Sequence, residues 1–213
     1  MMDLRATGAT TAGAGVVDSK NVVLSAPGDT VTLGLFAKVT GTDGVNNEQM
    51  QSIFGLVNSV GAAKGNMSGG YVPAFFTAGV SQNGSVLDWD SDGDLDIGLS
   101  PTNSSGVGKF AGRSTSPTPM PSLGGAVLVG EFVWTVTDAS GSFDLNFTVR
   151  SNNGNNLAQT ALWFEDGSTI SKNPTNSPIT VGPPVTWGPE PSSLSAVVLT
   201  GIGLLNRRHR GER

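Results

Sequence analysis

A chain of 213 residues has room for one domain and a short extension. Only 14% of the residues are charged, 30 are glycine and the formal net charge is −5, a composition typical of secreted all-β chains. There is no cysteine, and the single histidine is His209 near the C-terminus. This composition excludes disulfides, thiol chemistry, serine–histidine catalysis and the usual zinc sites from the body of the protein.

The basic residues form no stripe that could track a phosphate backbone. Before residue 189 the chain has 15 acidic and eight scattered basic residues, so this part carries a formal charge of −7. Phosphate backbones are bound by clustered lysine and arginine side chains. We therefore expect no nucleic-acid partner.

Alternating apolar and polar residues predict strands along most of the chain. Leu4 and Ala6 alternate with charged residues as in an edge strand, and residues 30–39 alternate behind a Pro27–Gly28 turn. Residues 142–149 alternate most clearly, and the short segment before them predicts a hairpin with residues 132–136. Weaker strand signals cover 21–24, 52–57, 72–76, 127–129, 161–164 and 179–181.

Nine or so short strands separated by turn residues predict an all-β, antiparallel β-sandwich over residues 1–182. Two segments rich in glycine, serine or proline, 61–70 and 114–121, are predicted to be mobile loops. Gly182-Pro183-Pro184 is expected to end the domain, so that residues 183–188 form a stalk.

Two strand patterns resemble cohesin-type and related carbohydrate-binding sandwiches. Val22–Leu24 leads through a turn into Pro27–Leu33, like the first strands of that fold, and Gly130–Trp134 is similar to a late strand. The resemblance implies a jelly-roll or Ig-like, cohesin-like sandwich and is used for the fold, not for a ligand.

One acidic stretch, Asp88–Gly98, carries the chemical motif of the chain. Carboxylates occupy relative positions 1, 3, 5 and 9 with glycine at position 6, the spacing of calcium loops. We expect one Ca²⁺ with side-chain oxygens and one backbone oxygen as ligands. The expected side-chain ligands are Asp88, Asp90, Asp92 and Asp96, and Asp94 is expected to use its backbone carbonyl.

The stretch resembles the calcium loops of FG-GAP, thrombospondin type 3 and dockerin repeats. It departs from an EF-hand at position 12, where Leu99 replaces the bidentate glutamate. This departure favours a static, structural site. The alternative is a solvated acidic turn, but five aspartates within nine residues repel one another without a cation.

Other candidate residues have structural interpretations beside functional ones. Most strand aromatics are expected in the core, whereas Trp89 and Tyr71 lie next to loops and are candidates for sugar stacking. Glu131 and Glu165 could form a glycosidase pair, which needs two carboxylates about 5–10 Å apart. Two acidic residues in a sandwich are more often on the surface.

The last 25 residues combine three parts in a fixed order. An extended Pro-Glu-Pro tripeptide is followed by the apolar run 192–205 and a basic cluster. The run is short for a stable span of about 20 residues, and arginines at its end stay on the cytoplasmic side. The tripeptide is Pro189, Glu190 and Pro191, and the basic residues that stop transfer are Arg207, Arg208 and Arg210.

This order resembles the PEP-CTERM sorting signal, with Gly188 in place of the usual hydrophobic residue before the tripeptide. The resemblance covers residues 189–213 and implies a short apolar helix held transiently in the inner membrane until an exosortase cleaves the chain. The protein would then reach the cell surface or the extracellular matrix. Residues 1–7 lack an export signal, so we expect the exported form to begin upstream.

The sequence leaves two functions open. The first is a non-enzymatic, calcium-stabilised module that binds exopolysaccharide or a surface protein. The second is a calcium-dependent carbohydrate-active enzyme that uses Glu131 and Glu165.

Overall fold

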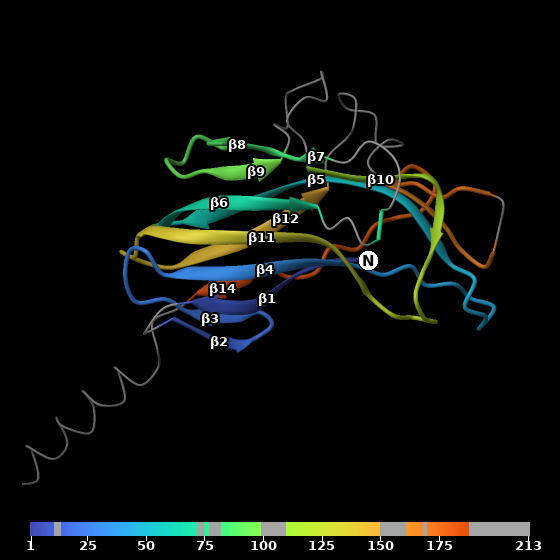
Figure 1. Cartoon of the computed structure of the whole chain (residues 1–213), viewed down its shortest axis with the longest axis horizontal. Helices are drawn as coiled ribbons and strands as arrows, with labels where there is room; N and C mark the ends of the chain where they lie inside the picture. Colours follow the sequence, from blue (N-terminus) through green and yellow to red (C-terminus); the bar gives the residue numbers. More distant parts are fainter. Residues whose placement is uncertain are drawn as a thin grey trace, which may run out of the picture.

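The computed structural model describes residues 1–10, 14–71, 75–76, 82–98, 110–149, 161–167 and 170–187 (Figure 1). All regular secondary structure in these ranges is β, which confirms the all-β prediction. Among the described residues no helix is long and apolar enough to cross a membrane. The strands are β1 Met2–Thr10, β2 Gly15–Asp18, β3 Asn21–Val23, β4 Thr30–Ala37, β5 Gln49–Gly61, β6 Lys64–Tyr71, β7 Gln82–Asn83, β8 Ser85–Leu87, β9 Asp96–Gly98, β10 Phe110–Pro119, β11 Val127–Asp138, β12 Phe143–Val149, β13 Ala161–Phe164 and β14 Val185–Trp187.

The strands form two sheets in a sandwich-like arrangement. The smaller sheet has the order β1-β4-β11-β6 and is antiparallel throughout. The larger sheet runs β2-β3-β14-β12-β5-β10-β7, with β13 and β9 also paired to β5 and β8 paired to β9. Its β3–β14 pair is parallel, so this sheet is mixed.

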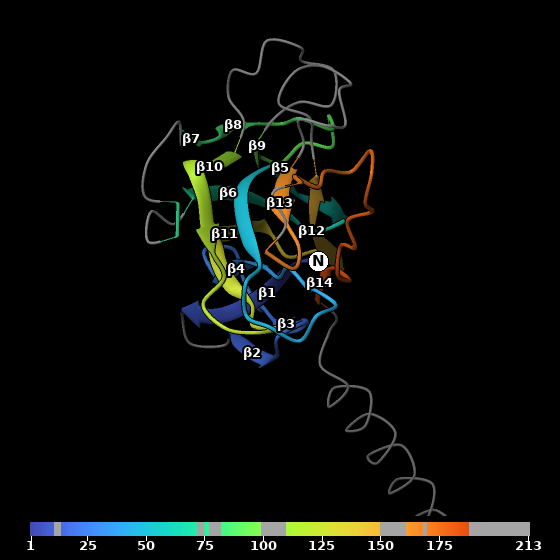
Figure 2. The same ribbon diagram turned by 90° about the vertical axis from the view of Figure 1, so that its right-hand side faces the viewer.

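The long strand β5 organises the larger sheet. Its first half lies between β10 and β13, which Figure 2 shows from the end of the molecule, and its second half pairs with β12 and β9. Residues 52–57 are buried without interruption. Burial of consecutive residues is typical of a strand that is covered on both faces. This strand has the acidic loop on one flank.

Aromatic side chains join the two sheets. Trp134 of β11 is fully buried, and its ring centroid lies 4.2 Å from that of Phe143 on β12. Phe143 in turn stacks on Trp187 of β14 at 5.7 Å. Burying an aromatic side chain contributes about 2–3 kcal/mol, so these contacts anchor the core between the sheets.

The predicted hairpin between residues 132–136 and 143–149 is wrong, although both strands are present. β11 belongs to the smaller sheet and β12 to the larger one. The connection therefore crosses between sheets. Alternation identifies a strand but not its partner, because any strand with an apolar face can pack against another.

The two predicted loops are also wrong. Most of residues 61–70 lies in β6, and most of 114–121 lies in β10. At Gly69 (φ 110°) an added Cβ would approach the Glu131 carbonyl oxygen to 2.4 Å, so glycine permits the close pairing of β6 with β11. The glycines mark close backbone approach here, not a turn.

The predicted stalk contains a strand of the sandwich. Val185 is fully buried, and β14 pairs with both β12 and β3. Residues 185–187 thus pack in the body instead of leaving it at residue 182, because Val185 and Trp187 find apolar partners there. The expected C-terminal helix and the sorting residues 189–213 lie outside the described residues.

Candidate metal centre

The acidic loop, residues 88–96, connects β8 to β9 and contacts both sheets (Figure 1). β9 pairs with β5 of the larger sheet. Leu95 forms a bridge with β6 of the smaller sheet, since Met67 N donates to Leu95 O at 2.6 Å and Leu95 N donates to Gly65 O at 3.2 Å. Any ion held by this loop would therefore act where the two sheets meet.

The loop curls around the carboxylate of Asp88. The backbone N–H groups of Asp92 and Gly93 donate to the two Asp88 oxygens, each at 3.1 Å. Ser91 and Gly93 have φ values of 64° and 99°, a left-handed conformation that glycine adopts without strain. These turns bring the ends of the loop together.

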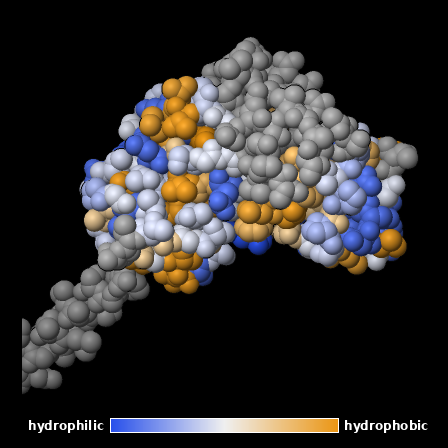
Figure 3. Space-filling model, viewed as in Figure 1, coloured by the Kyte–Doolittle hydropathy of each residue, from blue (hydrophilic) through white to orange (hydrophobic). Residues whose placement is uncertain are grey.

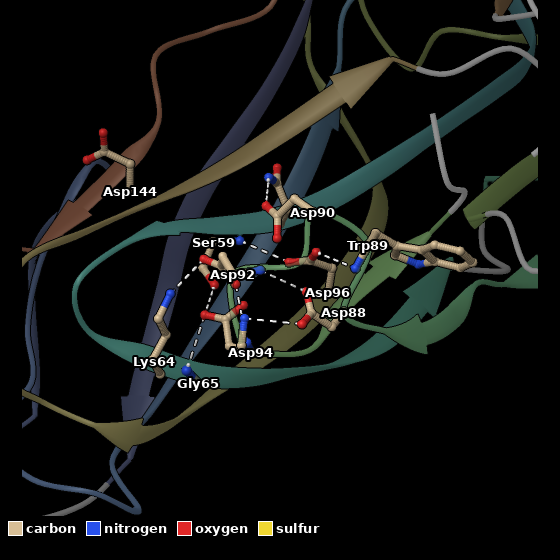
Figure 4. Close-up of polar contacts among 12 residues, drawn as sticks. Ser59, Lys64, Gly65, Asp88, Trp89, Asp90, Asp92, Asp94, Asp96 and Asp144 are labelled. Carbon is tan, nitrogen blue, oxygen red and sulfur yellow. Dashed lines mark hydrogen bonds and ion pairs between the residues drawn. The ribbon is translucent and has the colours of Figure 1, made fainter. Parts of the chain in front are cut away.

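Three carboxylates converge as a result (Figure 4). Asp88, Asp90 and Asp96 each offer an oxygen within 4.8 Å of the other two. Asp96 is fully buried beneath the exposed Asp88 and Asp90. Two ionised groups at this separation repel by about 3 kcal/mol at an effective dielectric constant of 20, and a cation reverses that term. The triad could hold a metal ion.

The pKa values of two loop aspartates are raised, as expected for acidic groups without a nearby cation. Burial, with a contribution from the charge of Asp90, raises the pKa of Asp96 to about 7. Burial also raises the pKa of Asp94 to about 6, against the hydrogen bond from Ser59 and with the charge of Asp92. A cation bound at the triad would keep these carboxylates ionised.

Two buried oxygens beside the triad lack hydrogen-bond partners. Asp94 is 3% exposed, and its Oδ2 accepts from Ser59 Oγ and, at 3.4 Å, from Gly65 N, but its Oδ1 has no partner. Asn58 donates from Nδ2 to Asp90 at 3.1 Å, while its Oδ1 is also without a partner. Buried polar atoms are rarely left unsatisfied, so these oxygens indicate an absent donor, water or ion.

The structure brings together three of the five predicted aspartates. Asp92 instead forms an ion pair with Lys64 at 2.8 Å, and the Asp94 side chain links β5 to β6. Leu99 lies outside the described residues. The supporting residues Asn58, Ser59 and Lys64 were not predicted, because they are 28–37 positions away in sequence. They come near only because β5 and β6, from different sheets, both lie beside the loop.

The remaining candidates come from several elements, and Tyr71 of β6 pairs with Gly130, next to Glu131 on β11. Trp89 is half-buried and donates from Nε1 to Ser85 O at 3.3 Å, whereas the Tyr71 side chain lies outside the described residues. Glu165 accepts from Trp163 Nε1 at 2.9 Å and lines a cavity of about 240 Å³. Glu131 is exposed on β11 of the smaller sheet and is not among the residues that line this cavity.

Comparison with known protein families, curated proteins and solved structures found no match. The function is therefore argued from the residues of this chain.

Proposed function

We propose that this protein is an exported, non-enzymatic surface or matrix module whose β body is stabilised by one Ca²⁺ in the acidic loop. The convergence of Asp88, Asp90 and Asp96 over a buried floor carries the proposal. The buried Asp94, whose Oδ1 has no hydrogen-bond partner, lies in the same loop but outside this group of three.

The donor set favours calcium among common metals. All donors are hard oxygens, whereas zinc prefers nitrogen and sulfur and magnesium demands a near-ideal octahedron. An irregular set of carboxylates completed by water suits the flexible coordination of Ca²⁺. Asp88, Asp90 and Asp96 would bind the ion, and Asp92 and Asp94 stay candidates for the wider ligand set.

The position of the loop explains why an ion would stabilise the fold. The loop hydrogen-bonds to β5 through Asp96 and to β6 through Leu95. The chain has no cysteine, so no disulfide holds the sheets together. A ligand that binds only the folded state adds about 2.7 kcal/mol at 100 times its Kd, a large gain for one domain.

A thermal unfolding series tests the calcium site. We expect the Tm of the metal-stripped protein to rise with added Ca²⁺ and to rise much less with Mg²⁺. Asp90→Ala combined with Asp96→Ala is expected to abolish the rise. An unchanged Tm in saturating Ca²⁺ for the unmutated protein would contradict the proposal.

Export and sorting are proposed from the sequence of residues 189–213 alone. We expect an exosortase to remove the segment near Pro189, Glu190 and Pro191 after transient anchoring in the inner membrane. Intact-mass measurement of the native protein tests the processing: a mature form that still ends at Arg213 would contradict it.

A further inference from the structure

A cavity of about 240 Å³ lies near the start of the chain, which is labelled N in Figures 1 and 2. Strands of both sheets line it: β1 through Met2, β5 through Met50 and β13 through Trp163. Residues 178–180 line it as well, and Met2 N donates to the carbonyl oxygen of Thr180 at 2.8 Å. The cavity thus lies between the sheets and is framed by hydrogen-bonded backbone.

The cavity is separate from the candidate metal centre. Met50 is at the start of β5, whereas Asn58 and Ser59, which contact the acidic loop, are in the other half of that strand. A rise of about 3.3 Å per residue puts roughly 25 Å of strand between Met50 and Asn58. A molecule in the cavity would therefore bind whether or not the acidic loop holds a cation.

Most of the cavity lining is apolar. Met2, Met50, Ala161 and Trp163 are each at most 7% exposed. Figure 3 shows hydrophobic surface where the chain begins, and Met1 at the rim of the cavity is 48% exposed. Protein interiors hold few voids larger than a water molecule, and an apolar cavity of about 150 Å³ binds benzene. This cavity therefore has room for one ring and a short polar group. Methionine sulfur and an indole both favour an aromatic ring.

One carboxylate gives the cavity its polar side. Glu165 accepts through Oε1 from Trp163 Nε1 at 2.9 Å and from Ser177 Oγ at 3.5 Å. Its Oε2 has only Lys172 Nζ, at 3.9 Å, among the described residues. That separation is too long for a hydrogen bond, so Oε2 can still accept one from a bound molecule.

The charge of Glu165 selects the polar group of the ligand. Lys38 also lines the cavity, but its Nζ lies close to Gly124, which is not one of the lining residues. A carboxylate ligand would therefore be repelled by Glu165, and Lys172 leaves little gain for a second cation. A neutral hydrogen-bond donor meets neither obstacle.

We propose that this cavity binds a small neutral molecule with one aromatic ring and a hydroxyl group. Glu165 accepts a hydrogen bond from the hydroxyl, while Met2, Met50 and Trp163 contact the ring. An apolar enclosure with one oriented polar group is typical of small-molecule sites. The site is independent of the calcium ion of the proposed function.

Methionine methyl groups provide a site-specific NMR readout. The full chain with labelled methionine methyls would be titrated with phenethyl alcohol, and with hydrocinnamate and phenethylamine as the anionic and cationic probes. We expect saturable shifts of the Met2 and Met50 signals by the alcohol, with a Kd of about 1 mM or lower in EDTA and in Ca²⁺ alike. Both charged probes should bind more weakly, the acid by roughly tenfold. Met67 is buried in β6 beside the acidic loop and is the internal control.

Two variants test the cavity and its polar group separately. Ala161→Leu fills the cavity from β13 and should abolish the shifts. Glu165→Gln keeps the side-chain shape without filling the cavity, and should bring the affinities for the alcohol and the acid to within about threefold of each other. Glu131→Gln, exposed on β11 and outside the lining, is the matched control and should change neither affinity.

Four results would overturn the inference. They are the absence of saturable Met2 and Met50 shifts with the alcohol, equal shifts at Met67, binding of either charged probe as tightly as the alcohol, and unchanged discrimination against the acid in Glu165→Gln. None of them bears on the calcium site, which the Tm series tests.

Discussion

Two acidic regions of this protein shift the pKa of a carboxyl group in opposite directions. In the acidic loop, residues 88–96, three carboxylates converge and burial raises the pKa of Asp96 to about 7. In the region formed by residues 41–48 and Asp166, main-chain donors also hold carboxylates, but here the pKa of Asp166 is lowered. Thr42 and Asp43 donate their N–H groups to Asp166, and Gly41 N donates to Glu48 at 3.0 Å.

The difference lies in the balance of donors and charges, not in the number of acidic residues. Hydrogen bonds from the Thr42 side chain and backbone lower the pKa of Asp166, which satisfies its charge in place. In the acidic loop backbone N–H groups also bind Asp88 and Asp96, but burial and the charge of Asp90 outweigh them and raise the pKa of Asp96. Only the arrangement in the acidic loop calls for a cation.

The largest expected effect comes from Asp96→Asn, which should reverse sign with calcium. In EDTA at pH 8 the variant removes a buried charge that destabilises the folded state by about 2 kcal/mol after solvent screening. It also leaves one backbone N–H without its acceptor, which costs about 1 kcal/mol. We expect a net stabilisation of about 1 kcal/mol. In saturating Ca²⁺ the variant loses a ligand and should be less stable than the unmutated protein.

Urea unfolding in both conditions measures this reversal. Asp144→Asn is the matched control, because Asp144 is exposed on β12 and is drawn apart from the loop carboxylates in Figure 4. A loss of stability in EDTA as well as in Ca²⁺ would mean that Asp96 serves the fold without a metal.

The next effect is the pH dependence of the metal-free protein. The pKa values of Asp94 and Asp96 are raised to about 6 and about 7, so the folded state holds these protons more tightly than the unfolded state. Their stabilisation is complete below about pH 4 and is lost as pH rises through 6 to 7, by about 2 kcal/mol per group after screening. Stability profiles from pH 4 to 8, measured with EDTA and with Ca²⁺, test this. The fall should flatten with Ca²⁺, and a metal-free profile that rises from pH 5 to 8 would contradict the assignment.

The smallest effect is expected in the second region. Asp166→Ala removes the acceptor of the Thr42 and Asp43 N–H groups and should lower the urea midpoint equally with EDTA and with Ca²⁺. The lowered pKa of Asp166 means that its contribution is present above about pH 4 and disappears on further acidification. A calcium-dependent change in this variant would show that the two regions are coupled.

The sequence by itself determined the local elements and the acidic motif. Period-two alternation identified the strands around residues 30–37 and 143–149, because a half-buried strand must place apolar side chains on one face. The spacing of five aspartates around a glycine turn predicted a shared metal site, since a short loop imposes its geometry through neighbouring residues. Three of the five, Asp88, Asp90 and Asp96, converge.

Tertiary structure decided everything that depends on distant partners. Strand alternation could not assign β11 and β12 to different sheets. The glycines of β6 predicted a loop from sequence alone, because only the structure shows that β6 pairs with β11. The position of β5 and β6 beside the acidic loop likewise decides three features of the site. It buries Asp96, pairs Asp92 with Lys64 and brings Asn58 to Asp90. The repulsion among the loop carboxylates and their raised pKa values result from that packing, because water would screen the same carboxylates in an exposed turn.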